Sequence, residues 1–555
     1  MKKVFFILCA LAALTACDTE GLGLFQNDTS QDNTANRIKG DFGGLKLDLT
    51  ITLGDATAGT KATVKNDFAV NDVVFVTITG YHASHHYLEL KKTGADTWTA
   101  TPKNGFNIEL YNTTGTMTAV YFPYGSSLDL KTSTGAVVFE DREDHQYYYG
   151  GLFYQAENAA YEINGGVLCG TLNLVAPNLS VGGHDDDKFI HFDITGYTDG
   201  HDYKLYQDYV TPIRFIGINE MGIVAWETGN AGAALQGYKD SGNDIISFSG
   251  LLNSSAVGSE LDYQFSIIDW TDSIAYTRDA GNKTLSTSKY IGIGDISTST
   301  WNAMEFVDMG VSDNYRHLYW AKRNVGATAD NGRDSYGKYF AWGDPNGYYL
   351  EDPWNPDPVN YPGIYLDVCT HKFNTRPVCD VDGNGNLLPA YDGAKATLKG
   401  FWRMPTDSEA GSLSSNTSKA FSEEGVTLTS NIVGYESRLI FLPTAGSLEY
   451  DDGYDAMYDQ FGCYPLEREG RTRLDPEDSE SLVTCYEGRF WTSTKTEIPN
   501  PEDPEGDPID GVGFLRLETH AVDASYTGSF SSAITGSQSV FIKGQPIRAV
   551  FQVPE

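Results

Sequence analysis

The first 300 residues are dominated by short stretches in which apolar and polar residues alternate. In residues 45–53 a leucine or isoleucine occupies every odd position, and this period of two is typical of a strand with one buried face. Similar short runs, bounded by glycine, asparagine and aspartate, follow at residues 61–64, 72–78, 87–90, 97–100, 107–110 and 117–121. No helical periodicity interrupts them, so we expect an all-β sandwich over residues 41–160.

A second set of strand-like runs continues to about residue 298. It comprises residues 167–175, 189–194, 209–218, 245–248, 263–268 and 288–293. Three consecutive aspartates at 185–187 and the pair Gly281-Asn282 indicate exposed turns. We therefore expect a second all-β sandwich over residues 161–298.

The pattern changes after residue 305, where glycine-punctuated segments replace regular alternation. Residues 402–409 predict an extended segment that turns sharply into a helix. The Thr406 hydroxyl is placed to cap that helix, and Glu409, three residues on, can reach back to complete a capping box.

The N-terminus has the features of an export signal. Lys2 and Lys3 precede an apolar run that is too short to span a bilayer, and the run ends in LTAC, which resembles a bacterial lipobox. The resemblance implies that residues 1–16 are removed and that Cys17 is acylated, which anchors the chain to a membrane through its lipid only. An ordinary secretory signal with an incidental cysteine is the alternative. Residues 17–40 are polar and are expected to form a flexible spacer.

Charge and cysteine content narrow the cellular context. Acidic residues just after Cys17 resemble the surface-export signal of Bacteroidetes lipoproteins, so the expected location is the outer face of the cell outer membrane. A formal net charge of −36 argues against nucleic acid and anionic lipid as partners. Export permits disulfides, and Cys369 and Cys379, which would close a short loop, are the first candidate pair. An odd number remains once Cys9 and Cys17 are set aside from the seven cysteines, so they cannot all pair within the chain.

Residues 45–295 resemble the Bacteroidetes fimbrillin family. The matching segments after the lipobox and the first alternating strand are TKAT at 60–63, FAVNDV at 68–73 and AVYFPY at 119–124. The resemblance implies cleavage after a basic residue beyond the first strand, after which a strand from another pilin subunit fills the vacated groove by donor-strand exchange. Lys61 is then the first candidate for the cut and Arg37 the second. Solvated loop charge is the alternative interpretation of both residues.

Residues 305–551 resemble the Fibrobacter succinogenes major paralogous domain family. The matching segments, in chain order, are VDMGV at 307, LYWA at 318, NVGA at 324, YGKYFAWGD at 336, WRMPT at 402, LIFLPTAG at 439, FWTST at 490 and IRAV at 547. The resemblance implies an α+β fold related to C-type lectins and formylglycine-generating enzymes over residues 300–555. Trp342 and Trp402 are expected core anchors, and Arg403 and Arg548 are expected to hydrogen-bond carbonyls or a carboxylate.

One segment of this region carries two kinds of candidate binding chemistry. Residues 344–400 include five aromatic side chains among prolines, and aromatic faces stack well on sugars; the five are Tyr348, Tyr349, Trp354, Tyr361 and Tyr365. Rigidification of exposed loops is the alternative role for them. Asp380, Asp382 and Asn384 match the first half of a calcium loop, although the bidentate glutamate at position twelve is replaced by Tyr391. A plain Asx turn is the alternative there, and calcium is the only cofactor suggested.

These features favour a surface adhesin. The expected function is that of a fimbrial tip or minor pilin subunit with a lectin-like adhesive domain, because residues 553–555 leave no strand to donate. A stand-alone surface lipoprotein that binds an unknown glycan or protein without polymerising is the main alternative. An enzyme of the formylglycine-generating type is a second alternative, with Cys463 and Cys485 available as thiols. We expect no catalysis, since no hydrolase, nucleotide-binding or metalloprotease motif is present.

Overall fold

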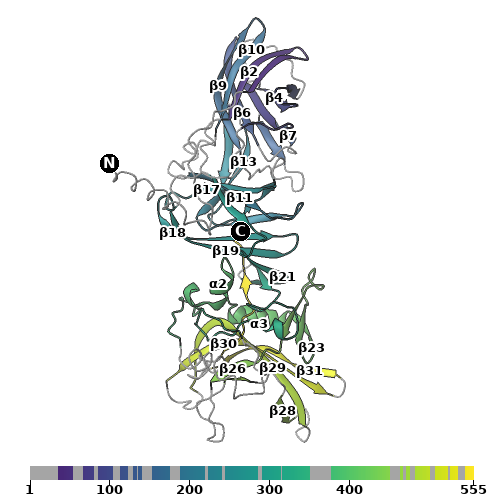
Figure 1. Ribbon diagram of the computed structural model, residues 1–555, viewed down its shortest axis with the longest axis vertical. Helices are drawn as coiled ribbons and strands as arrows, with labels where there is room; N and C mark the ends of the chain where they lie inside the picture. Colours follow the sequence, from purple (N-terminus) through teal and green to yellow (C-terminus); the bar gives the residue numbers. More distant parts are fainter. Residues whose placement is uncertain are drawn as a thin grey trace, which may run out of the picture. The chain divides into compact units, whose positions relative to one another are not determined.

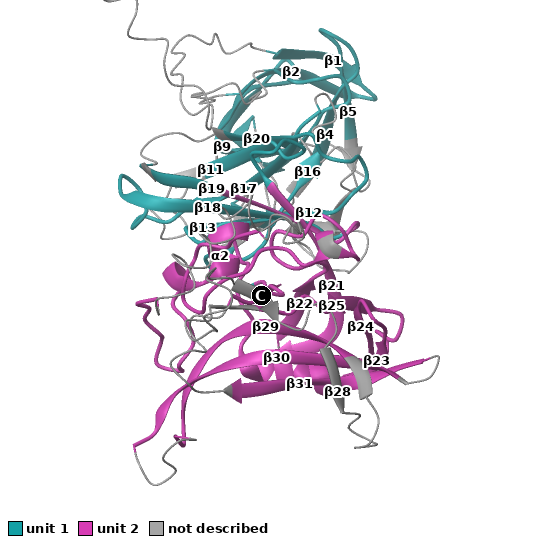
Figure 2. Cartoon of the chain, turned by 60° about the horizontal axis from the view of Figure 1, so that its bottom comes forward, with its two compact units in different colours: residues 1–270, 279–301, 554–555 teal, residues 271–278, 302–553 magenta. Residues whose placement is uncertain are grey.

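The computed structural model describes residues 36–53, 67–79, 85–103, 113–122, 129–133, 136–140, 153–175, 188–218, 223–239, 244–284, 290–313, 316–349, 377–450, 463–466, 471–474, 482–500, 507–522, 525–535 and 544–554. Over this part the chain is a multidomain, predominantly β protein with several sheets and very little helix. Figure 2 colours its two compact units: unit 1 comprises residues 1–270, 279–301 and 554–555, and unit 2 comprises residues 271–278 and 302–553.

The first sheet of unit 1 has eight strands in the order β1-β2-β10-β9-β6-β3-β4-β5 and curls into a near-barrel. Its strands are β1 (Asn36–Phe42), β2 (Leu45–Leu53), β3 (Val73–Thr79), β4 (His85–Lys92), β5 (Trp98–Lys103), β6 (Thr114–Tyr121), β9 (Tyr154–Asn164) and β10 (Val167–Leu174). All neighbours are antiparallel except β2 and β10, which run parallel and lie side by side in Figure 1.

The first sheet confirms the strongest sequence pattern and corrects two expectations. Every odd position of β2 is buried, as the alternation predicted. However, β1 begins at Asn36, inside the stretch 17–40 that was expected to be a spacer. Only Ile38 and Phe42 are large and apolar in β1, so its alternation is weak. The expectation that residues 167–175 belong to the second set was also wrong, because β10 pairs with β2 and β9. Local periodicity does not reveal such a long-range parallel pairing.

The second sheet of unit 1 has the order β20-β11-β17-β13-β8-β7, with β14 beside β13 and β16 beside β17. Its strands are β7 (Asp129–Ser133), β8 (Ala136–Glu140), β11 (Lys188–Thr195), β13 (Val210–Ile218), β14 (Val224–Thr228), β16 (Tyr238–Lys239), β17 (Ile246–Leu252) and β20 (Tyr290–Asp295). Unit 1 also contains β12 (Tyr203–Tyr206), β15 (Leu235–Gln236) and β18 (Glu260–Asp269). Phe215 of β13 contacts Phe122 and Phe153 edge-on at 5.0 and 5.6 Å between ring centroids, so one core joins side chains of both sheets.

The described part of unit 2 combines short sheets with two short α-helices. Its strands are the start of β19 (Ile274–Thr284), β21 (Asn302–Asp313), β22 (Arg316–Ala321), β23 (Thr417–Phe421), β24 (Gly425–Ser430), β25 (Leu439–Pro443), β26 (Ser447–Tyr450), β27 (Cys463–Leu466), β28 (Arg471–Leu474), β29 (Leu482–Ile498), β30 (Ile509–Val522), β31 (Ser525–Thr535) and β32 (Val550–Phe551). The helices are α2 (Gly393–Leu398) and α3 (Asp407–Ser415), with 3-10 turns η3 (Arg333–Ser335) and η4 (Pro389–Tyr391). The four-stranded sheet β28-β29-β30-β31 contains the two longest strands, β29 with 17 residues and β30 with 14, and Figure 1 shows β29, β30 and β31 together.

The capping box predicted at residues 406–409 is confirmed. Glu409 N–H donates to the Thr406 hydroxyl at 3.2 Å, and Thr406 N–H donates to the Glu409 carboxylate at 2.8 Å. Arg403 donates two hydrogen bonds to the same carboxylate, at 2.7 and 2.5 Å, although Glu409 is only 1% exposed. The helix thereby presents Ala410 and Leu413 to the core of unit 2.

The expected structural roles of the tryptophans and of Arg548 are also confirmed. Trp342 donates its indole N–H to the Thr492 carbonyl at 2.8 Å, and Trp402 packs edge-on against Phe551. The buried Arg548 guanidinium donates to three carbonyl oxygens, those of Ala321, Lys322 and Phe441. Burial lowers the pKa of Arg548 to about 9. These contacts hold separate segments of unit 2 together.

Candidate functional site

The best-defined candidate is the N-terminal hairpin of unit 1, made of β1 and β2. A two-glycine turn joins its strands, and both glycines have positive φ, +71° at Gly43 and +100° at Gly44. Side chains are strained in that region, which explains glycine at both positions. The Asp41 carboxylate accepts the Gly44 N–H at 2.8 Å and fixes the turn. The resulting antiparallel register pairs Phe42 with Leu45 and Asn36 with Ile51.

β2 is held mainly by its buried apolar face. Its five inward side chains are at most 6% exposed; they are Leu45, Leu47, Leu49, Ile51 and Leu53. Burial of each contributes about 1.5–3 kcal/mol, so the strand as a whole contributes roughly 7–15 kcal/mol of hydrophobic stabilisation. β2 fills the position between β1 and β10, and its removal together with β1 would uncover the edge of β10.

Arg37, the second candidate for cleavage, lies within β1. Its guanidinium donates to both oxygens of Asp48 at 2.8 Å, and Lys39 lies 3.6 Å from the same carboxylate. The hydrogen bond from Arg37 is the main cause of the lowered pKa of Asp48. A protease that cuts after Arg37 must first separate β1 from β2, because a cleavable segment has to be unpaired. Lys61, the first candidate, is outside the described residues.

A polar cluster at one end of this hairpin surrounds a buried ammonium, although its Asp67 side chain is 45% exposed. Lys92, the last residue of β4, is 4% exposed, and its ammonium donates to the Asn36 side-chain oxygen at 3.1 Å. The same ammonium lies 3.5 Å from the Asp67 carboxylate and 6.0 Å from the centroid of the Trp98 ring. The Asn36 amide donates to Asp67 at 2.7 Å. We call Asn36, Lys92 and Asp67 the polar latch.

Sequence reasoning missed the polar latch, although part of the signal was present. Lys92 continues the inward-facing positions Leu88 and Leu90 of β4, and Asn36 precedes the inward-facing Ile38 of β1. A polar residue at an inward position of a strand requires a buried partner. The partner could not be identified, because β1 and β4 are far apart in the sequence and are not neighbours in the sheet.

The aromatic loop of unit 2, residues 344–400, is described at residues 344–349 and 377–400. Tyr348 exchanges backbone hydrogen bonds with Tyr339, both at 2.9 Å, and so returns the chain to a buried segment. Tyr349 is 51% exposed, and its hydroxyl donates to the Gly326 carbonyl at 3.0 Å. The Lys338 ammonium lies 5.3 Å from the Tyr349 ring centroid, so this aromatic face already carries a cation. Trp354, Tyr361 and Tyr365 lie outside the described residues.

Two cysteine predictions stay open. Cys17 and Cys369 are outside the described residues, so neither acylation nor a Cys369–Cys379 disulfide is tested. The Cys379 sulfur lies 2.6 Å from the point that a Cβ on Gly343 would occupy, which requires glycine there. Cys169 in β10 is a free thiol whose sulfur lies 3.6 Å from the Val167 carbonyl oxygen.

The proposed calcium loop has the geometry of an Asx turn. One oxygen of Asp382 accepts the backbone N–H groups of Asn384 and Asn386, at 2.8 and 2.9 Å. The Tyr391 hydroxyl lies 3.3 Å from the Asp380 carboxylate, which raises the tyrosine pKa. One carboxylate oxygen of Asp382 thus already stabilises the turn, which is the alternative interpretation of this sequence. Calcium binding by Asp380, Asp382 and Asn384 stays a prediction.

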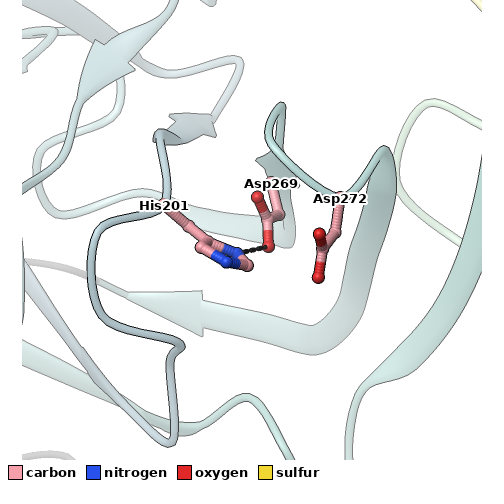
Figure 3. A group of neighbouring side chains, drawn as sticks. All are labelled: His201, Asp269 and Asp272. Carbon is pink, nitrogen blue, oxygen red and sulfur yellow. Dashed lines mark hydrogen bonds and ion pairs between the residues drawn. The ribbon is translucent and has the colours of Figure 1, made fainter.

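A group of one histidine and two aspartates offers metal-ligand chemistry that the sequence did not indicate. His201, Asp269 and Asp272 have ligand atoms within 4.8 Å of one another, and Figure 3 shows the two carboxylates beside the imidazole ring. His201 Nδ1 lies 2.8 Å from an oxygen of the buried Asp269, a hydrogen bond that orients the ring. A metal bound through Nδ1 would have to replace this bond.

Among the described residues, no helix has the length and apolar character needed to cross a membrane.

Comparisons with known proteins add no identification. The chain matches no protein-family model, no curated protein and no solved structure.

Proposed function

We propose that this chain is a cell-surface lipoprotein that serves as a fimbrial tip or minor pilin subunit. In this proposal unit 1 accepts a strand from another subunit, and unit 2 carries the adhesive surface. The observation that carries the proposal is the β1–β2 hairpin, an N-terminal element that fills the sheet beside β10. The segment that joins it to β3 contains Lys61, so one cut there would disconnect the hairpin from the rest of unit 1.

The proposed assembly step is strand replacement. Loss of the hairpin would leave β10 with unpaired backbone groups between Leu168 and Leu174, together with an apolar groove. A strand from a neighbouring subunit would restore the hydrogen bonds, and its alternate apolar side chains would refill the positions of Leu47, Leu49 and Ile51. The register would be well specified, since a shift of one residue exposes the whole apolar face.

The role of unit 2 in the proposal is adhesion. We assign it the α+β, lectin-like fold implied by its motifs, with unit 1 as the pair of fimbrillin-like sandwiches. β32 pairs with β22 inside unit 2, through Val550 with Trp320 and Phe551 with Tyr319. A strand used in this way is not available to a neighbour, which suits a subunit that accepts a strand and donates none. The exposed Tyr349 is the first residue to test for ligand contact.

The test is maturation followed by fractionation. Cells that make the full chain are treated with a trypsin-like protease, and the cut is mapped by mass spectrometry in fimbrial and monomeric fractions. We expect loss of the residues before position 62 and entry into high-mass fimbriae, with K61Q blocking both and R37Q blocking neither. A chain that stays monomeric and keeps its N-terminal residues under all conditions would contradict the proposal and favour a stand-alone surface lipoprotein.

The ligand requires a separate experiment. A glycan array probed with the full chain, with and without calcium, is compared with the Y349A variant. Reduced binding by Y349A would support a sugar-binding role for this ring, whereas unchanged binding would exclude the described part of the aromatic loop.

A further inference from the structure

We propose that the polar latch makes the acceptor groove selective for a two-stranded donor segment whose outer strand, in the place of β1, carries a carboxamide side chain, asparagine or glutamine, at its end. This inference rests on the proposed strand replacement. It identifies the chemistry of the incoming segment, which has an inner strand with alternating apolar residues beside β10 and an outer strand with a carboxamide at the position of Asn36.

The argument starts from which groups stay after the cut. Asn36 belongs to the hairpin and would leave with it, whereas Asp67 and Lys92 follow Lys61 in the sequence and would remain. Lys92 would then lose the acceptor at 3.1 Å, and Asp67 would lose the donor at 2.7 Å. With the hairpin in place the ammonium is buried, and it also lies near the Asp67 carboxylate and the Trp98 ring. A segment that refills the groove buries this charge again, and burial of a charge without its hydrogen-bond partner is strongly unfavourable.

The two remaining groups together define what can replace Asn36. Lys92 offers only donors, and an ionised Asp67 offers only acceptors. A carboxamide has one acceptor and one donor group, so a single side chain satisfies both, as Asn36 does in the hairpin. A carboxylate at this position would satisfy Lys92 but face Asp67 as a like charge. An aliphatic side chain would satisfy neither residue.

The register of the hairpin also determines the position of this side chain. Asn36 pairs in register with Ile51, two residues before the end of β2, and Ile38 pairs with Leu49. The carboxamide therefore lies in the outer strand, opposite the Ile51 position of the inner strand and two residues from Ile38. An incoming segment that matches the apolar row of β2 but lacks this carboxamide would fill the groove and leave Lys92 and Asp67 without their partner.

The test uses the hairpin itself as the probe. A site-specific protease sequence replaces residues 57–63 of the full chain, the chain is cut, and a fluorescent peptide of residues 36–53 is exchanged into the groove. Affinity is measured by polarisation for the wild-type peptide and for N36L, N36D and K39L; Lys39 is exposed and serves as the matched control. Each peptide is measured on four chains: wild type, K92M, D67N and the neighbouring control K91M.

On the wild-type and K91M chains we expect N36L to bind at least tenfold more weakly than the wild-type peptide, with K39L within twofold. On the K92M chain, the N36L peptide should bind only about twofold more weakly than the wild-type peptide. Because both peptides are compared on the same chain, the stability of that chain does not affect the ratio of their affinities. N36D should bind weakly to wild type and regain affinity on D67N, which tests the latch even if K92M does not fold. Equal binding of the wild-type and N36L peptides to the wild-type chain would overturn the latch alone. Failure of every peptide to bind would overturn the acceptor groove and the latch with it.

Discussion

Truncation of Leu49 to alanine tests whether the apolar face of β2 holds the hairpin in place. Leu49 is completely buried at the middle of the strand, opposite Ile38 in β1 and Gly170 in β10. If the buried side chains retain the hairpin, L49A should loosen β1 and β2 more than it loosens the rest of unit 1. Lys46, an exposed residue of the same strand, gives the matched control K46A.

The expected magnitude follows from the surroundings of Leu49. Leucine-to-alanine changes in cores destabilise by about 2–5 kcal/mol, with the larger values where the cavity cannot collapse. The neighbour in β10 is glycine, which has no side chain to move into the space, and a Cβ on Gly170 would already lie 2.7 Å from the Met117 methyl group. We therefore expect about 3–5 kcal/mol for L49A, and less than about 0.5 kcal/mol for K46A.

Hydrogen exchange of backbone amides, read by mass spectrometry, separates local from global effects. At about 1.36 kcal/mol per tenfold, L49A should speed exchange in residues 36–53 by roughly 150-fold to 5,000-fold. Amides of β3 and β6 should be affected less, because the hairpin can open without unfolding the whole sheet. Exchange in residues 36–53 within twofold of wild type, or equal acceleration in β3 and β6, would refute the idea that these side chains hold a separable hairpin.

Three further predictions concern unit 2. R403M should destabilise unit 2 by about 1–3 kcal/mol, because the buried Glu409 loses its cation; the 32% exposure of Arg403 moderates this loss. Chemical denaturation should show that adding E409Q to R403M recovers part of the lost stability. If the effects of R403M and E409Q are additive in the double variant, the pairing is contradicted. Burial raises the pKa of Tyr319 to about 12, so its neutral form stabilises unit 2 fully below pH 10 and this stabilisation is lost as pH rises from 10 through 12; the phenolate absorbance of wild type minus that of Y319F should titrate near pH 12, and a difference that titrates near pH 10 in folded protein would refute it. D382A should lower the stability of unit 2 by about 1 kcal/mol, because it removes an acceptor of two backbone amides. Thermal melts should show the same loss in calcium and in chelator. A loss of stability seen only with calcium would indicate a metal-binding loop instead.

The features that the sequence predicted well depend on neighbouring residues. The β2 alternation and the Thr406–Glu409 capping box are both complete within nine residues, so the pattern and the physical cause coincide. The Asp382 turn is similar, since a carboxylate that accepts amides two and four residues ahead needs no distant partner. These local patterns predicted individual strands, turns and helix ends, but they did not predict which strands pair in a sheet.

The features that the sequence did not predict depend on pairing between distant segments. β10 faces β2 in parallel, and β1 is retained as an edge strand by β2 although its own alternation is weak. His201 meets Asp269 only because β18 ends beside the segment that leads into β12. All three features depend on the order of the strands in the sheets, and the periodicity of a single strand carries no information about that order.

Lys92 shows how a local pattern can mark a distant contact without identifying it. The order Leu88, Leu90, Lys92 places a charge where the strand faces the core, and such a charge is retained only if a partner balances its loss of solvation. In this protein part of that balance comes from Asn36, in the N-terminal hairpin, and part from Asp67, beyond the candidate cleavage site. A permanent core would gain little from a buried cation whose partners lie on both sides of a candidate cleavage site. An exchangeable one would gain a means of distinguishing one incoming strand from another, which an apolar row of leucines alone does not provide.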